Sequence, residues 1–170
     1  MSPDSILHSG RPGSDELVPS RYALRVGEID VMVVSDGVIS ISAEAMATNA
    51  DPAVRSAWLR ERLQPEVMDW ALNEVVVRSG GRTILIDSGL GMEAPNFPRT
   101  GRWSSRLEAA GIDLASVTDV VLTHMHFDHV GGLLVDGVQD QLRPDLRIHV
   151  SAAEAEFWQS PDFSRTAMPG

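Results

Sequence analysis

The 170-residue sequence contains no cysteine and no lysine. Without cysteine the chain forms no disulfide, offers no thiolate to a metal and has no cysteine nucleophile. Without lysine, a mechanism that passes through a Schiff base on a lysine side chain is excluded. All 14 basic residues are arginine, and 24 acidic residues outnumber them. The resulting formal net charge of −10 is poorly suited to following a phosphate backbone, which argues against a nucleic-acid substrate.

Long apolar runs are also missing from the sequence. None approaches the roughly 18 consecutive apolar residues that a membrane-spanning helix needs. The first residues, Met1 to Ser5, lack the basic and apolar regions of a secretory signal, so a cytoplasmic location is expected. Residues 1–20 are rich in Ser, Pro and Gly and are expected to form a flexible arm. A single domain is expected to follow over residues 21–170.

Residue types that bind metals are concentrated in the segment Thr123-His124-Met125-His126-Phe127-Asp128-His129, which Gly131-Gly132 closes. The preceding run, Asp119 to Thr123, is apolar and β-branched, which predicts a buried strand. Imidazole nitrogen and carboxylate oxygen are ligands that zinc and similar divalent ions accept. Because these residues start where a buried strand ends, they have a rigid base. The segment therefore predicts a metal site, and a solvated polar loop is the alternative.

The pattern H-x-H-x-D-H after an apolar strand resembles the signature of the metallo-β-lactamase fold superfamily. A second match lies upstream, where Thr83 to Gly89 resembles that family's strand followed by Asp-x-Gly. The order and separation of the two elements also agree with the family. The resemblance extends over roughly Ile29 to Trp158, which is most of the chain.

This resemblance implies roles for individual residues. His124 and His126 would help to hold one metal ion, and Asp128 and His129 would help to hold a second. Asp87 would be a buried carboxylate that orients the ligands from behind, and for Asp87 taken alone the better interpretation is an aspartate that caps a turn at the end of a strand. Asp128 is also expected to act catalytically, by carrying a proton to the leaving group. Zinc, as one or two ions, is the expected cofactor, although nitrogen and oxygen ligands also accept iron, manganese and cobalt.

Two further segments, Val33 to Gly37 and Ile148 to Trp158, resemble the methyl parathion hydrolase-like branch of the superfamily. That branch resembles N-acyl-homoserine lactonases, phosphotriester hydrolases and a hydrolytic dehalogenase that acts on chlorothalonil. The dehalogenase is the most similar in local sequence over Ser2 to Val38 and Asn73 to Gly89. The resemblance implies a metal-dependent hydrolase of small organic molecules, with dehalogenation of a chlorinated aromatic expected first. Lactone or phosphotriester hydrolysis is one alternative, and a non-catalytic binding module is the alternative from another class.

The family's fold is a four-layer αββα sandwich of two similar halves, over a longer chain than this one. The fold class expected here is therefore α/β, as the N-terminal portion of such a sandwich, and incomplete at the C-terminus. His149 is the only histidine after His129, and it is expected to be an ordinary strand residue. Half a sandwich exposes an apolar sheet face. The chain is therefore expected to be a fragment or a homo-oligomer such as a dimer, or to have kept the fold and lost the chemistry.

Hairpins followed by a strand–helix–strand rhythm predict an α/β layered architecture. Strands are expected at 21–26, 28–35, 38–41, 74–79 and 82–86, with turns at Asp36-Gly37 and Gly80-Gly81. Helices are expected from Asp51-Pro52 to about Pro65, then through Trp70 to Leu72, over 102–110, and from the capping box at Ser151 to about Gln159. Residues 89–101 are expected to form a loop over the site. Met92, Phe97 and Trp103 are candidate wall residues there, and ordinary core packing is at least as good an interpretation of each.

Overall fold

The computed structural model describes residues 19–92 and 97–164. The expected arm over residues 1–20 thus lies outside the described residues, except for Pro19 and Ser20. No helix in the described ranges is long and apolar enough to cross a membrane. The elements, in chain order, are β1 (Arg21–Val26), β2 (Ile29–Ser42), α1 (Ala43–Met46), α2 (Pro52–Glu61), β3 (Val67–Ser79), β4 (Arg82–Ile86), α3 (Trp103–Ala109), η3 (Leu114–Ser116), β5 (Asp119–Val121), α4 (Phe127–Val130), η4 (Gly131–Leu134), α5 (Val138–Gln141), β6 (Arg147–His149) and α6 (Ala152–Gln159).

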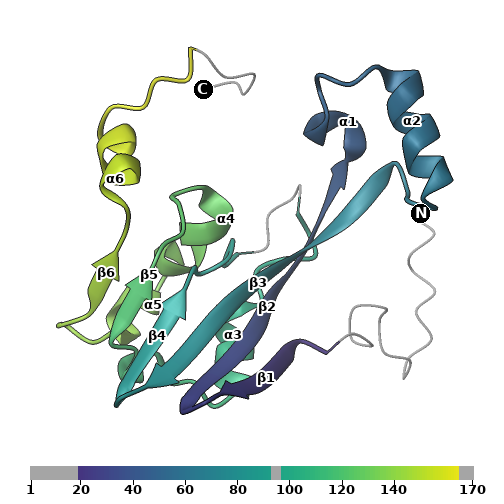
Figure 1. Cartoon of the computed structure of the whole chain (residues 1–170). Helices are drawn as coiled ribbons and strands as arrows, with labels where there is room; N and C mark the ends of the chain where they lie inside the picture. The colour runs from purple at the N-terminus through teal and green to yellow at the C-terminus, as the bar shows by residue number, and fades with distance from the viewer. Residues whose placement is uncertain (1–18, 93–96, 165–170) are drawn as a thin grey trace, which may run out of the picture.

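The strands form one six-stranded sheet in the order β1-β2-β3-β4-β5-β6 (Figure 1). The first four strands are antiparallel, and the last three run parallel to one another. The β3–β4 hairpin turns at Gly80 and Gly81, both with positive φ, which confirms the predicted two-residue turn. The parallel pair β4–β5 matters most for function, because the carboxyl ends of parallel strands meet at one edge of a sheet.

Two sequence predictions about the antiparallel region are wrong. Asp36-Gly37 is not a hairpin turn, because β2 continues through it with a β-bulge between Ser35 and Gly37. The short helix predicted through Trp70 to Leu72 is instead part of β3, which pairs with β2 along its whole length. In both places long-range strand pairing outweighs the local turn or helix signal.

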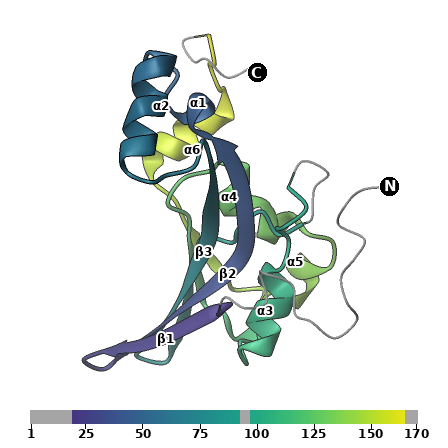
Figure 2. The ribbon, with the colours of Figure 1, turned by 90° about the vertical axis from the view of Figure 1, so that its right-hand side faces the viewer.

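The hydrophobic core lies on one face of the sheet. Helices α3 and α5 lie on that same side (Figure 2). Trp103 and Leu107 of α3 are fully buried, and they pack in one cluster with alternate residues of the strands. The strand members of this cluster are Val34, Val76, Leu85 and Val120. The two-residue period of the strands explains the selection, because successive residues of a strand point to opposite faces and only alternate residues point into this core.

The opposite face of the sheet is also apolar. Val33 pairs with Val75, Val75 with Ile86, and Val77 with Ile84, so these β-branched side chains form one continuous surface. Each of them stays partly exposed, and none belongs to a buried cluster of the described residues. A sheet with parallel strands is normally covered on both faces. The described chain therefore forms two layers, sheet and helices, with an apolar sheet face that remains open, as expected for half of a sandwich.

Candidate metal centre

Asp87 connects the two segments that form the candidate metal centre. It follows β4 directly and has a left-handed backbone (φ 59°), so its side chain turns toward the end of the neighbouring β5. Its carboxylate accepts hydrogen bonds from the Thr123 backbone N–H (2.8 Å) and hydroxyl (2.7 Å). The same carboxylate contacts His129 Nδ1 at 2.8 Å. Asp87 thus links the first and last residues of the histidine motif, and its side chain is only 13% exposed.

These contacts determine which histidine nitrogens can bind a cation. A carboxylate only accepts hydrogen bonds, so His129 Nδ1 carries the proton in its bond to Asp87, and the lone pair of the neutral ring is on Nε2. The Thr123 hydroxyl donates to Asp87 and can accept from His124 Nδ1 at 3.1 Å. That arrangement leaves the lone pair of His124 on Nε2 as well. Burial, reinforced by the neighbouring His129 and His126, lowers the pKa of His124, which favours the neutral form that metals bind.

The donor atoms of the motif are arranged in two pairs. His124 Nε2 lies 3.0 Å from His126 Nδ1, and His129 Nε2 lies 3.4 Å from an Asp128 carboxylate oxygen. Two ligands at about 2.0–2.1 Å from a tetrahedral zinc ion are themselves roughly 3.3 Å apart. The rings of His124 and His129 are in contact, with centroids 3.9 Å apart, so the two pairs are neighbours. The donor types and their spacing therefore suit divalent metal ions, pair by pair.

The motif does not form a complete metal cage. Across residues 19–92 and 97–164, no group of three or more His, Cys, Asp or Glu side chains is arranged to hold a metal ion. A tetrahedral zinc ion takes three or four protein ligands. The two pairs therefore need further ligands, as expected if this chain supplies only part of the set.

Glycines bring the loops of the two strands into close contact. The Ser88 N–H and hydroxyl both donate to the His129 carbonyl, at 2.8 and 2.9 Å. A Cβ on Gly132 would lie 2.0 Å from the Ser88 carbonyl oxygen, and one on Gly91 would lie 2.2 Å from Gly132 Cα. These approaches are possible only without side chains. The Gly131-Gly132 pair that closes the motif therefore fixes the ligand segment against the end of β4.

Asp36 holds the next part of this loop in place. It is fully buried and accepts hydrogen bonds from four backbone N–H groups far away in sequence. They belong to Leu90 (3.1 Å), Gly91 (3.3 Å), Gly101 (3.3 Å) and Trp103 (2.7 Å). One carboxylate thereby joins the loop after β4 to the start of α3. This role is hidden in the sequence, because an Asp-Gly pair is also a strong local turn signal.

Glu74 is a second buried carboxyl group near Asp36, and no sequence pattern pointed to it. Glu74 is only 3% exposed, and its side chain approaches both Asp36 and Gly89 closely. Burial, with contributions from the Asp36 and Asp87 carboxylates, raises the pKa of Glu74 to about 8. Glu74 is therefore protonated at neutral pH, beside the Asp36 side chain that accepts four backbone hydrogen bonds.

Helix α6 carries an aromatic cluster beside the motif. The Trp158 ring lies 6.2 Å from the His126 ring, nearly perpendicular to it. Phe157 and Phe163 contact the same tryptophan, with centroid distances of 5.4 and 5.8 Å. Of the wall residues suggested by the sequence, Trp103 is in the core, Phe97 packs on a small buried cluster, and Met92 is 47% exposed. No sequence pattern indicated that the aromatic residues of α6 lie beside the motif.

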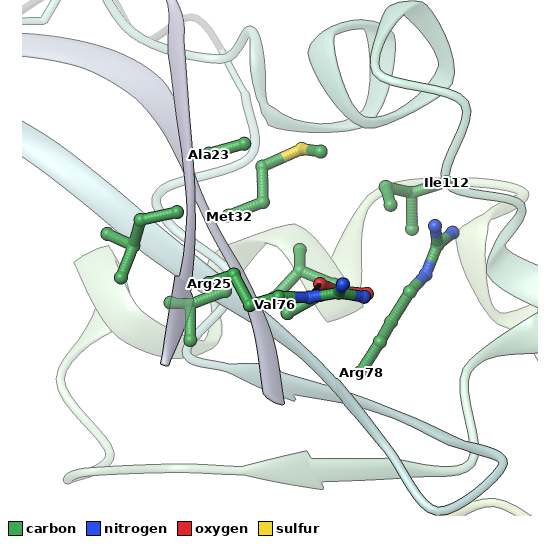
Figure 3. Close-up of a pocket in the computed structure, with 9 residues that line it drawn as sticks. Ala23, Arg25, Met32, Val76, Arg78 and Ile112 are labelled. Atoms are coloured by element: carbon green, nitrogen blue, oxygen red, sulfur yellow. Dashed lines mark hydrogen bonds and ion pairs between the residues drawn. The ribbon is translucent and has the colours of Figure 1, made fainter. Parts of the chain in front are cut away.

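Two other features lie away from the motif. His149 Nε2 lies 2.8 Å from the buried Asp119 carboxylate, which also accepts hydrogen bonds from Arg82 and Arg147. These contacts agree with the structural role predicted for this histidine. A cavity of about 400 Å³ lies between β1, β2, β3 and Ile112 (Figure 3). No motif residue lines this cavity.

Comparison with known proteins agrees with this geometry. A model of the Metallo-beta-lactamase superfamily matches residues 70–163, which is more than half of the chain. The chain therefore belongs to the Metallo-beta-lactamase superfamily, and the resemblance drawn from the histidine motif is confirmed. Among curated proteins, a probable metallo-hydrolase from Mycobacterium bovis is 27% identical over 96 residues, covering 48% of this chain and 29% of that protein. A probable metallo-hydrolase from Mycobacterium tuberculosis matches to the same extent.

Solved structures show the same fold. AidC, described as a dizinc quorum-quenching lactonase, superposes with a TM-score of 0.73 and 28% identity, over 85% of this chain and 49% of AidC. The hydrolase AbOPH of the beta-lactamase superfamily gives a TM-score of 0.71 with the same identity and coverage. A probable metal-dependent hydrolase from Staphylococcus aureus, 17% identical with a TM-score of 0.65, shares the fold. The chain thus spans about half the length of these structures, and less than a third of the curated relatives.

Proposed function

We propose that this chain is the metal-binding N-terminal part of a hydrolase that acts on a small organic molecule. The observation that carries the proposal is the pairing of donor atoms at the end of the parallel strands β4 and β5. His124 pairs with His126, and His129 pairs with Asp128. The dizinc lactonase and the metallo-hydrolases among the similar proteins support the same class of chemistry.

In this proposal His124 and His126 hold a first divalent ion, with zinc expected, and Asp128 and His129 contribute to a second. Such ions supply Lewis-acid polarisation of the substrate and lower the pKa of water to about 7. Asp87 keeps the proton of His129 on Nδ1, so that Nε2 is the binding atom. Asp128 is 34% exposed and carries a proton to the leaving group.

The domain organisation is part of the proposal. Residues 21–170 form one domain after an arm over 1–20, and a further αβ layer covers the open sheet face. Similar structures of about twice the length support a second half of the same fold as that layer. A second copy of the chain, forming a homodimer, is the alternative. On sequence grounds the protein is proposed to act in the cytoplasm, and neither nucleic acid nor a membrane is proposed as a partner.

The proposed substrate is a small, neutral or weakly polar molecule. Hydrolytic dehalogenation of a chlorinated aromatic is proposed first, from the local sequence resemblance. Lactone or phosphotriester hydrolysis is the second candidate, which the similarity to AidC favours. The aromatic cluster around Trp158, beside His126, suits an apolar or aromatic substrate group in either case.

The test is a hydrolysis panel with the zinc-loaded chain, using an N-acyl-homoserine lactone, a phosphotriester and chlorothalonil. His129→Ala and Asp128→Asn are compared with His149→Ala, which alters a histidine outside the motif. Turnover that is lost in the two motif variants and kept in His149→Ala supports the proposal, and the substrate that is turned over identifies the substrate class. Zinc binding without turnover indicates either a structural metal domain or a site whose remaining ligands lie outside this chain. If the chain shows no zinc binding and no turnover, a non-catalytic module is favoured.

A further inference from the structure

We infer that Glu154 is a positioning residue that holds the ligand segment of the metal site in place from helix α6. This inference deepens the proposed metal site and rests on it. Glu154 lies 25 residues beyond the end of the histidine motif and is partly buried. One of its carboxylate oxygens, Oε2, accepts hydrogen bonds from the Met125 backbone N–H (3.0 Å) and the Trp158 indole N–H (2.9 Å).

The first of these bonds acts on the backbone between two proposed ligands. Met125 separates His124 from His126, whose donor nitrogens lie 3.0 Å apart. Side chains of successive residues in an extended segment point to opposite sides, whereas those two residues apart share a side. Fixing the Met125 amide therefore fixes the direction in which both imidazoles point. Because the acceptor is a carboxylate, the bond is stronger than one between neutral groups.

The second bond places an aromatic ring against a ligand. Trp158 lies one helical turn after Glu154, and its ring meets that of His126 edge-on at 6.2 Å. The indole bond to Glu154 holds this orientation, so one oxygen atom secures both the backbone before His126 and a ring packed beside it.

The sequence offered a different role for Glu154. The pattern Ser151-Ala152-Ala153-Glu154 predicts a capping box, in which the glutamate reaches back to the backbone of the serine. Half of that motif is present, because the Ser151 hydroxyl accepts from the Glu154 N–H at 3.2 Å. The glutamate side chain instead extends to Met125. Helix α6 starts with its serine cap alone, which leaves the carboxylate available for the metal segment.

The experiment compares Glu154→Ala with Glu154→Gln, which keeps an acceptor oxygen, and with Glu156→Ala, an exposed glutamate on the same helix. Amide hydrogen exchange measured by NMR on the full chain reports on Met125 directly. Exchange at Met125 is expected to be about tenfold faster, or more, in Glu154→Ala. Glu154→Gln should recover part of the protection, and Glu156→Ala should match the unsubstituted chain. Equal exchange in Glu154→Ala and Glu156→Ala would overturn the inference.

Zinc affinity and tryptophan emission complete the test. Zinc should bind roughly 10- to 100-fold more weakly to Glu154→Ala, because the Met125 amide behind the ligands has lost its carboxylate acceptor. The emission assigned to Trp158, by comparison with Trp158→Phe, should also shift. Faster Met125 exchange with unchanged zinc affinity would overturn the positioning role. If the unsubstituted chain takes up no zinc, the proposed metal site fails on this chain, and Met125 exchange alone decides whether Glu154 holds the segment.

Discussion

Substituting the buried Glu74 by glutamine should stabilise the protein at alkaline pH and have little effect at acid pH. The unfolded glutamate releases its proton near its ordinary pKa of 4.5, whereas burial raises the pKa of the folded group to about 8. Between these values the folded chain holds a proton that the unfolded chain has lost, so stability falls as pH rises. The slope is about 1.4 kcal/mol per pH unit. Over the whole window the loss is on the order of 5 kcal/mol.

Glutamine has the shape of the protonated acid and no titration, so Glu74→Gln removes this loss. Urea unfolding at pH 5, 6, 7, 8 and 9 measures the difference in free energy of unfolding between the variant and the unsubstituted chain. That difference should be small at pH 5, grow with pH and level off above pH 8. Glu108→Gln, on the exposed side of α3, serves as the control and should give a flat difference. Parallel curves for Glu74→Gln would refute the argument that a buried, protonated Glu74 lies beside Asp36.

Three further substitutions test the residues that hold the histidine motif in place. Gly132→Ala places a Cβ 2.0 Å from the Ser88 carbonyl oxygen, so thermal unfolding should begin at a clearly lower temperature; an unchanged melting temperature would contradict the close approach. Asp36→Ala leaves four backbone N–H groups without their buried acceptor and should cost about 3 kcal/mol or more in urea unfolding. A loss below about 1 kcal/mol would show that water replaces this carboxylate. Asp87→Asn should weaken zinc binding roughly 10- to 100-fold by disturbing the proton on His129, and equal calorimetric affinities would exclude that role.

The strands and turns around the histidine motif could be predicted from sequence because their signals are local. The strand before Thr123, the hairpin at Gly80-Gly81 and the carboxylate after β4 are each marked by neighbouring residues. The missed features depend on partners far along the chain. Asp36 binds amides more than 50 residues away, and Glu154 binds one 29 residues back. A single sequence shows that such residues can cap or turn locally, and it does not show which distant amides they meet in the fold.

The same limit explains the wrong helix in the antiparallel region. Trp70 lies between Asp69 and Ala71, two residue types that are depleted in strands, yet it pairs with Ile39 across the sheet. The helix from Pro52 is confirmed, with Asp51 accepting from two backbone N–H groups at its start. Its apolar residue Trp58, however, stays 52% exposed. Local capping thus predicted where the helix begins, whereas burial of its apolar side depends on elements that its own sequence does not specify.

The most direct test of the central claim is a zinc titration of the full chain followed by NMR of the imidazole nitrogens. We expect zinc to shift the nitrogen signals of His124 and His129 at Nε2 and of His126 at Nδ1. Nδ1 of His129 should keep its proton and its bond to Asp87, and His149 serves as the internal reference that does not shift. Shifts at His149 with none in the motif, or no zinc-dependent shift at any histidine, would contradict the assignment of this segment as the metal site.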